Sequence, residues 1–238
     1  MKVLMIIPAY NEEESILNTV MSIVEYRKKV DFDLDYVVIN DGSVDRTKEI
    51  LDSHHLNAIH LVMNLGIGGA VQTGYKYALE NNYDVAVQFD GDGQHDIESL
   101  DALLEPIRRQ QADLVVGSRF IGDKSSEFQT TFMRRFGITI ISAFIKLTTG
   151  KRILDTTSGY RLANRDIIRQ FAARYPIKYP EPESIVHILK RKYKVVEEPA
   201  NMFERAGGVS SITPIKSIRY MIEVCSSILI AAFMKESE

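Results

Sequence analysis

The sequence predicts an α/β fold in which a mostly parallel central sheet has helices on both of its faces, followed by amphipathic helices toward the C-terminus. Two observations favour this fold. Short apolar runs of strand length alternate with segments of helical apolar periodicity along the first hundred residues. Each of the first four apolar runs also ends in a polar loop. This alternation predicts parallel strands whose carboxyl ends, and therefore whose loops, share one edge of the sheet.

The first half of the chain supplies four of the expected strands. By these patterns, strands are expected at residues 3–7, 34–39, 58–63 and 85–89. Helices are expected from about residue 12 to 24, from residue 47, from 70 to 80 and from 97 to 110. Asn11 or a nearby polar group is placed to cap the first of these helices. Glu12, Glu13 and Glu14 are expected in its first turn, where the helix dipole favours acidic side chains.

The second half of the chain is less regular. A strand is expected at residues 112–116 and another at 194–197. An apolar amphipathic helix is expected at 136–147, and further helices at 165–175, 181–192 and 214–234. We find no internal repeat, low-complexity tract or convincing linker, so one domain with a C-terminal helical extension fits best.

Composition excludes several classes of protein. The chain has 238 residues, of which 45% are hydrophobic and 26% charged, as in globular proteins with a substantial core. Its formal net charge of -3 argues against nucleic acid as a partner. The single cysteine, Cys225, excludes a disulfide framework and is typical of a reducing compartment. The sequence shows no signal-peptide pattern, and no uncharged apolar run is long enough to span a membrane.

The stretch Val85-Ala-Val-Gln-Phe-Asp-Gly-Asp-Gly-Gln94 carries the clearest chemistry. Gly91 and Gly93 let the backbone turn sharply after the strand, so that Asp90, Asp92 and Gln94 can converge on one point. Hard oxygen ligands at a strand end suit Mg²⁺ or Mn²⁺ holding substrate phosphates. Aspartate and glycine are also the commonest turn residues, so the motif alone leaves a solvated turn equally open.

Six motifs in order carry a family resemblance over roughly residues 1–220. They are Pro8-Ala-Tyr-Asn-Glu12, Asn40-Asp-Gly-Ser-Val-Asp45, Asn64 with Gly66 and Gly68, Asp90–Gln94, Gly117-Ser-Arg119 and Ser158-Gly-Tyr-Arg161. Together they resemble family 2 glycosyltransferases of the GT-A (Rossmann-like) fold, and most closely the dolichol-phosphate mannose synthase-like and polyprenyl-phosphate glycosyltransferases. The resemblance implies a GT-A catalytic domain at residues 1–211, with an interfacial helix at about 134–149, and a C-terminal apolar helix at 212–238.

The resemblance also implies a nucleotide-sugar donor and a divalent metal, Mg²⁺ or Mn²⁺. The residues it assigns to the nucleotide-sugar are Pro8, Tyr10, Glu12, Asp41, Asn64, Gly68 and Asp90. Those it assigns to the metal are Asp90, Asp92 and Gln94. Tyr10 would pack on the base and Asp41 would accept a hydrogen bond from it. His95 is expected to pack beside this site rather than bind the metal, because hard cations prefer oxygen.

The expected acceptor is a polyprenyl phosphate such as undecaprenyl phosphate. A phosphate is already ionised near neutral pH, so it needs positive charge to hold it rather than a general base. The residues expected to hold it are Arg119, Arg134, Arg135, Arg205 and Lys216. The resemblance points most directly to Arg119, Arg134 and Arg205, with Arg135 as the alternative to Arg134, and these three with Asp92 are the residues expected to be catalytic. Arginine matches phosphate geometry with paired N–H donors. Any single one of these residues is equally typical of a solvated surface.

A lipid acceptor requires contact with a membrane surface. The apolar segment 136–147 is flanked by basic residues, as in helices that lie on anionic lipid. The segment 221–234 is equally apolar but too short to span a bilayer. We expect a peripheral enzyme on the cytoplasmic face of the cell membrane, with a small membrane-protein partner or self-association as further options. Core packing or a dimer contact is the alternative for both helices.

Two other functions stay open at this stage. A glycosyltransferase could act on a saccharide hydroxyl in cell-wall or capsular polysaccharide assembly, which would require a base such as Asp155 or Glu204. The chain could also be a non-catalytic nucleotide-sugar-binding module. A dinucleotide site at Gly66 and Gly68 is disfavoured because position 71 is valine. The expected donor is UDP-glucose or UDP-GlcNAc.

Overall fold

The structure, a computed structural model, describes residues 1–122, 132–203 and 214–233, and only the backbone of 132–134 and 214–220. Its strands are β1 (Lys2–Ala9), β2 (Asp33–Asn40), β3 (Ala58–His60), β4 (Val85–Gln88), β5 (Leu114–Ser118), β6 (Arg161–Asn164) and β7 (Val195–Pro199). Its helices are α1 (Ile16–Tyr26), α2 (Thr47–Ser53), α3 (Gly66–Glu80), the 3₁₀ turn η1 (Ile97–Ser99), α4 (Leu100–Arg108), α5 (Phe132–Thr149), α6 (Arg165–Ala173), α7 (Pro180–Lys190) and α8 (Pro214–Phe233).

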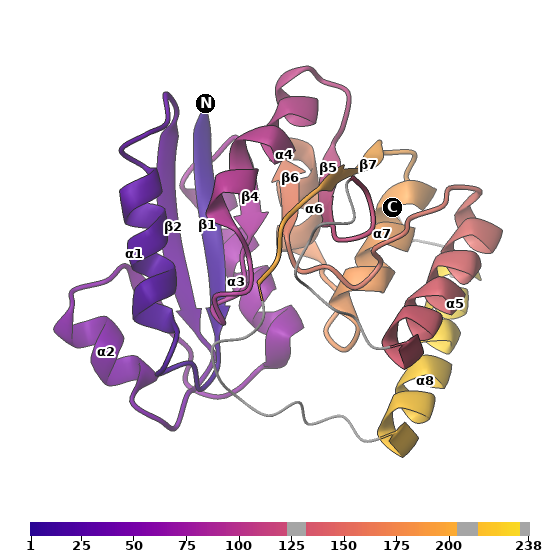
Figure 1. Ribbon diagram of the computed structural model, residues 1–238, viewed down its shortest axis with the longest axis horizontal. Coiled ribbons are helices and arrows are strands. Elements are labelled where there is room, and N and C mark those ends of the chain that lie inside the picture. The colour runs from indigo at the N-terminus through magenta and orange to yellow at the C-terminus, as the bar shows by residue number, and fades with distance from the viewer. Residues whose placement is uncertain (123–131, 204–213, 234–238) are drawn as a thin grey trace.

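The strands form one sheet in the order β3-β2-β1-β4-β6-β5-β7 (Figure 1). Every neighbouring pair is parallel except those that β6 makes with β4 and β5. The predicted fold class, a mostly parallel sheet with helices on both faces, is therefore confirmed. The strand β6 was not predicted, because its four residues begin with an arginine and follow a polar loop. Arg161 lies opposite Gln88 of β4 in the register.

The core has two layers, one on each face of the sheet. On β1, Val3, Met5 and Ile7 pack with side chains of α1, α2 and α4. Leu4 and Ile6 point the other way and pack with α3, α6 and α7, and with the buried sides of α5 and α8. The apolar run of β1 is thus buried on both faces, as expected of a central parallel strand.

The start of α1 corrects a prediction. The helix begins at Ile16 and has no acidic residue in its first turn, and Asn11 does not cap it. Asn11 instead has a positive φ of 56°, and its side-chain oxygen accepts a hydrogen bond from the Val44 amide at 2.9 Å. Glu12 lies in the same loop, where its amide donates to Thr47 Oγ1 at 2.9 Å. These bonds hold residues 11 and 12 against the loop after β2, which delays the helix.

The start of α3 corrects another. The helix begins at Gly66, four residues before the expected position. Gly68 therefore lies inside a helix rather than in a loop. A Cβ at this position would lie 2.3 Å from the carbonyl oxygen of Pro176. The glycine is required by this close packing of α3 against the segment before α7.

The helix α8 packs on α5 and α7 (Figure 1). Its Val224, Ile228 and Ala231 are buried in the same core cluster as the strand residues. The expected boundary between residues 211 and 212 falls outside the described residues and stays a prediction. Of the helices in the described part of the chain, none is long and apolar enough to cross a bilayer.

Candidate active site

A pocket of about 550 Å³ lies at the carboxyl ends of β1, β2 and β4. Its lining residues are Pro8, Ala9, Tyr10, Glu12, Asp41, Asn64, Gly66, Ile67, Ala70, Asp90, Gly91, Asp92, Thr157, Gly159 and Glu181. In open α/β sheets ligands bind at this edge. The structure thus gathers loops that follow separate strands around one cavity.

Most of the predicted donor residues line this pocket. Those that do are Pro8, Tyr10, Glu12, Asp41, Asn64, Asp90 and Asp92. Tyr10 is 46% exposed and offers an aromatic face at the rim. Asp41 is buried at the end of β2, and its Oδ1 accepts a hydrogen bond from the Leu65 amide at 2.7 Å. Burial raises the pKa of Asp41, while the amides of Leu65 and Gly66 lower it.

Two other predicted residues do not line the pocket. Gly68 packs against Pro176, as described above. Gln94 pairs with the chain near Phe203: its side-chain amide donates to the Phe203 carbonyl at 3.3 Å, and its own carbonyl accepts from the Phe203 amide at 2.7 Å. The third member of the expected metal set is therefore directed to a backbone partner.

The loop Asp90–Gly93 is shaped by close contacts. Thr19 Oγ1 of α1 donates to the Gly91 carbonyl at 3.2 Å, and Asp92 Oδ1 accepts from the Gln94 amide at 3.0 Å. On the opposite wall, a Cβ at Gly159 would lie 2.5 Å from Asp90 Oδ2. Only glycine at position 159 therefore leaves room for the Asp90 carboxylate where it stands.

The oxygen ligands that this loop offers suit a hard divalent cation. Asp90 and Asp92 present two carboxylates to one pocket, and Mg²⁺ in phosphate-binding sites takes one or two carboxylates and completes its shell with water and phosphate oxygens. Within the described ranges, no three Asp, Glu, His or Cys side chains cluster as a full protein-only metal site.

His95 lies beneath the acidic loop. Its Nδ1 accepts a hydrogen bond from the Asp90 amide at 3.1 Å, which places the proton of the neutral ring on Nε2, 3.5 Å from Asp90 Oδ2. The ring stacks on Tyr160 with centroids 4.9 Å apart. Burial lowers the pKa of His95 to about 4. His95 is thus neutral at pH 7 and holds Asp90 from below, in agreement with the packing role expected for it.

Arg119, predicted to hold the acceptor phosphate, is paired with a buried carboxylate. Its Nε and Nη2 donate to Asp155 at 2.7 Å each, and the two side chains are 6% and 0% exposed. Nη2 also donates to Thr157 Oγ1 at 3.1 Å. Through this bond Arg119 contacts Thr157, a residue that lines the pocket.

Most of the other basic residues predicted to hold the acceptor phosphate have side chains that the structure does not describe. Arg205 and the side chains of Arg134 and Lys216 are not among the described atoms. Arg135 is exposed, with its guanidinium carbon 5.7 Å from the centroid of the Phe120 ring.

Glu181, Thr157 and Gly159 line the pocket but were not predicted. Glu181 lies in the first turn of α7. Burial raises the pKa of the Glu181 carboxyl, an effect that nearby Arg161 opposes and Asp90 reinforces. The nearest signal in the sequence is the motif Ser158-Gly-Tyr-Arg161, since its arginine binds the start of α7.

Comparison with known proteins gives the family. The sequence model for glycosyl transferase family 2 matches residues 5–171. The chain belongs to this family. The glycosyltransferase is 35% identical over 175 residues to an undecaprenyl-phosphate mannosyltransferase of Micrococcus luteus, covering 71% of this chain and 69% of that protein. It is 30% identical over 215 residues to a UDP-N-acetylglucosamine–dolichyl-phosphate N-acetylglucosaminyltransferase of Methanococcus voltae, covering 82% and 83% of the two chains.

Among solved structures, the glycosyltransferase resembles glucosyl-3-phosphoglycerate synthase from Mycobacterium tuberculosis in complex with Mn²⁺, UDP-glucose and phosphoglyceric acid. The TM-score is 0.71 at 16% identity, covering 99% of this chain and 81% of that one. The predicted GT-A fold and the predicted enzyme class, a glycosyltransferase, are thereby confirmed. The roles assigned to individual residues stay predictions.

Proposed function

We propose that this glycosyltransferase moves a sugar from a nucleotide-sugar to a polyprenyl phosphate, with inversion at the sugar carbon and with Mg²⁺ or Mn²⁺. An oxygen of the acceptor phosphate attacks the anomeric carbon, the bond to the nucleoside diphosphate breaks, and the diphosphate leaves on the opposite face. The observation that most directly supports the proposal is that Tyr10, Asp41, Asp90 and Asp92 line one pocket. The two relatives named above act on undecaprenyl and dolichyl phosphates, which supports the choice of acceptor.

The donor would lie along the carboxyl edge of the sheet. The exposed ring of Tyr10 suits stacking on the base, and Asp41 can accept a hydrogen bond from a ring N–H of uracil or guanine. Pro8, Glu12 and Asn64 complete this end of the pocket. We favour UDP-glucose or UDP-GlcNAc as donor, and the solved relative that holds UDP-glucose and Mn²⁺ supports this choice.

Asp90 and Asp92 would hold the metal, with His95 fixing Asp90 from below through the 3.1 Å bond to its amide. A metal here would supply Lewis-acid neutralisation of the charge that develops on the departing diphosphate. The protein would contribute the two carboxylates, and the diphosphate would lie between Tyr10 and the acidic loop.

The position of Asp155 bears on which acceptor the enzyme uses. Transfer to a saccharide hydroxyl would need a carboxylate base, and Asp155 was one of two candidates. Asp155 is fully buried and bound by Arg119 through two bonds of 2.7 Å, so it is not placed to take a proton from a substrate. The other candidate, Glu204, lies outside the described residues. An acceptor phosphate needs no such base, which favours the polyprenyl phosphate.

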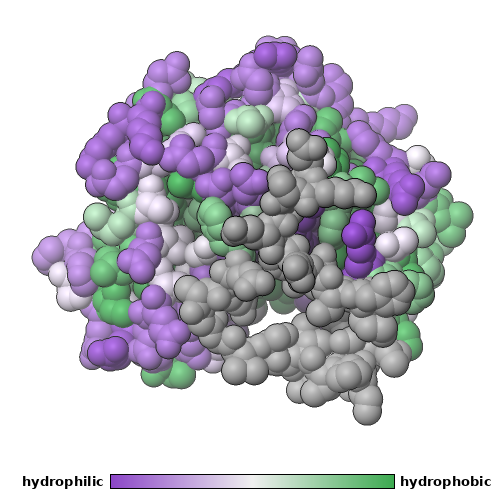
Figure 2. Space-filling model, viewed as in Figure 1, coloured by the Kyte–Doolittle hydropathy of each residue, from purple (hydrophilic) through white to green (hydrophobic). Residues whose placement is uncertain are grey.

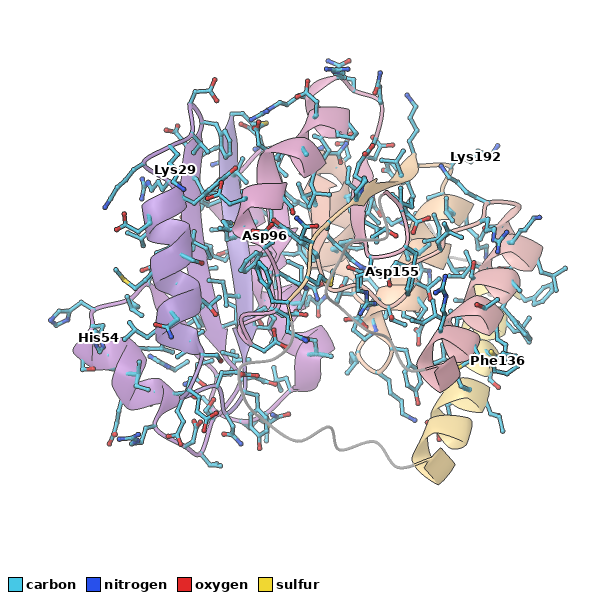
Figure 3. The ribbon with its side chains drawn as sticks, viewed as in Figure 1. Lys29, His54, Asp96, Phe136, Asp155 and Lys192 are labelled. Atoms are coloured by element: carbon cyan, nitrogen blue, oxygen red, sulfur yellow. The ribbon has the colours of Figure 1, made fainter. Side chains whose placement is uncertain are left out.

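The proposed membrane contact is the outer surface of α5 and α8. Phe136 and Leu147 on α5 are 56% and 79% exposed, and Ile230 and Phe233 on α8 are 60% and 82% exposed. Phe136 lies at the outer edge of the molecule (Figure 3), and hydrophobic residues gather at this edge in Figure 2. Exposed apolar side chains beside cations such as Lys146 suit adsorption to an anionic, cytoplasmic membrane face.

The test is transfer from UDP-glucose, UDP-GlcNAc or GDP-mannose to undecaprenyl phosphate in the presence of Mg²⁺ or Mn²⁺. We expect one donor to give product, and the Asp92→Asn variant to lose at least a hundredfold in rate, about 2.7 kcal/mol of transition-state stabilisation. Asp101→Asn, an exposed carboxylate on α4, is the matched control and should keep wild-type activity. Near-normal turnover in Asp92→Asn would show that the metal assignment is wrong.

A further inference from the structure

Glu181 is a charged residue of the pocket that has no role yet in the proposed reaction. The order of strands fixes where it lies. Asp41 follows β2, Tyr10 follows β1 and Asp90 follows β4. The next strand across is β6, and Gly159 lies two residues before its first residue, Arg161. A nucleotide-sugar with its base at Asp41 and its diphosphate at Asp90 would therefore direct its sugar toward Gly159 and Glu181.

The backbone of Glu181 is held independently of its side chain. Its carbonyl oxygen accepts hydrogen bonds from Arg161 Nη1 at 2.7 Å and from Ser184 Oγ at 3.1 Å. Arg161 is 1% exposed and also donates to the Ser158 carbonyl at 2.7 Å. The buried arginine thus ties the start of α7 to the loop before β6, and a change of the Glu181 carboxylate leaves these backbone bonds in place.

The charge of the pocket points to the kind of sugar. Among the described residues that line it there are carboxylates and no Lys or Arg. The guanidinium next to Glu181, that of Arg161, is buried and donates to the carbonyls of Glu181 and Ser158 and to Ser184 Oγ. A carboxylate accepts hydrogen bonds from sugar hydroxyl groups, and bonds to a charged acceptor are the stronger ones. A sugar that carries its own carboxylate would bring a further negative charge next to the Glu181 carboxylate, which like-charge repulsion disfavours.

We propose that Glu181 accepts hydrogen bonds from hydroxyl groups of the transferred sugar, and that it restricts the donor to uncharged hexoses and excludes uronic acids. This inference rests on the proposed function, because it assumes that a nucleotide-sugar occupies the pocket. It assigns Glu181 to substrate selection rather than to proton transfer.

The experiment compares ligands that differ only in the sugar. Binding of UDP-glucose, UDP and UDP-glucuronate, and in parallel GDP-mannose and GDP, is measured by calorimetry with Mn²⁺ for the wild type, Glu181→Gln and Glu181→Ala. Glu183→Gln, in the same helical turn but not lining the pocket, is the matched control. Thermal melting checks that each variant is folded.

For whichever nucleotide the wild type accepts, we expect Glu181→Ala to weaken binding of the neutral nucleotide-sugar at least tenfold, about 1.4 kcal/mol. Binding of the free diphosphate should change less than twofold. The wild type should discriminate against UDP-glucuronate relative to UDP-glucose, and Glu181→Gln should reduce this discrimination at least fivefold. Glu183→Gln should behave as the wild type.

Two results would overturn the inference while leaving the proposed function intact. One is an equal loss for the free diphosphate and the nucleotide-sugar, which would assign Glu181 a structural role. The other is unchanged binding with a large fall in kcat and a shifted pH profile, as expected of a general base. A folded wild type that binds no nucleotide or nucleotide-sugar would instead refute the proposed function, and the inference with it.

Discussion

The buried pair of Arg119 and Asp155 makes a sharp prediction about stability. Asp155 accepts two bonds of 2.7 Å from the guanidinium and a third, of 3.0 Å, from the Arg119 amide. In Asp155→Asn the shape is kept, but a guanidinium that is 6% exposed loses its counter-charge. Leaving one charge of a buried pair uncompensated costs about 3–5 kcal/mol. For a chain of this size the melting temperature should fall by roughly 6–20 °C.

The assay is urea denaturation followed by circular dichroism, with thermal melting as a second measure. The double variant Arg119→Met with Asp155→Leu should recover most of the loss, because replacing a buried pair by apolar side chains of similar size is often nearly neutral. The exposed pair Arg169–Asp166, with side chains 54% and 57% exposed, is the control, and Asp166→Asn should leave the midpoint unchanged within error. A loss below about 1 kcal/mol in Asp155→Asn would refute the reasoning, since the pair would then be accessible to solvent.

Two further predictions concern pH and membranes. The pKa of His95 falls from an ordinary value of 6.5 to about 4 in the folded state, so the unfolded state binds more protons between these values and the free energy of unfolding falls as pH drops through that window. This loss of stability is on the order of 3 kcal/mol. In His95→Asn the difference in urea midpoint between pH 7 and pH 4, measured without metal, should be smaller than in the wild type. An unchanged difference would contradict the prediction. Replacing Phe136 and Leu147 together by serine should lower binding to phosphatidylserine vesicles in a sedimentation assay at least tenfold. Met21→Ser, on the opposite face of the sheet and 43% exposed, should bind as the wild type does, and equal binding by all three proteins would exclude α5 as the contact.

The first half of the fold could be read from the sequence because its rules are local. A fully apolar run such as Val3–Ile7 is typical of a central strand that is buried on both faces of an α/β sheet. Parallel strands also bring the loops at their carboxyl ends to one edge of the sheet. That is why the sequence alone predicts that Tyr10, Asp41 and Asp90 lie together. The strand β6 could not be predicted in this way, because a run of four residues that begins with Arg161 does not resemble a buried strand. Arg161 can be buried there only because Ser184 Oγ and the Glu181 carbonyl accept hydrogen bonds from its guanidinium.

The residues whose placement differs from expectation depend on partners far along the chain. Gln94 fits a metal site by spacing, but it bonds to Phe203, more than a hundred residues later. Arg119 fits a phosphate site by residue type, but Asp155 neutralises it. Glu181 looked like an ordinary acidic helix start, and only the crossing of α7 beside β6 brings it to the pocket. Sequence periodicity contains no information about such pairings.

The insertion of β6 between β4 and β5 has a consequence for synthesis. During translation β4 emerges with β1 as its neighbour, and its other edge has no partner until residues 161–164 have been made. Nascent chains that expose a bare strand edge are prone to aggregation. The wall that contains Thr157, Gly159 and Glu181 also arrives only then. The half of the cavity assigned to the nucleotide can therefore be assembled well before the half assigned to the sugar, and a ribosome-bound intermediate would lack the wall that contains Thr157, Gly159 and Glu181.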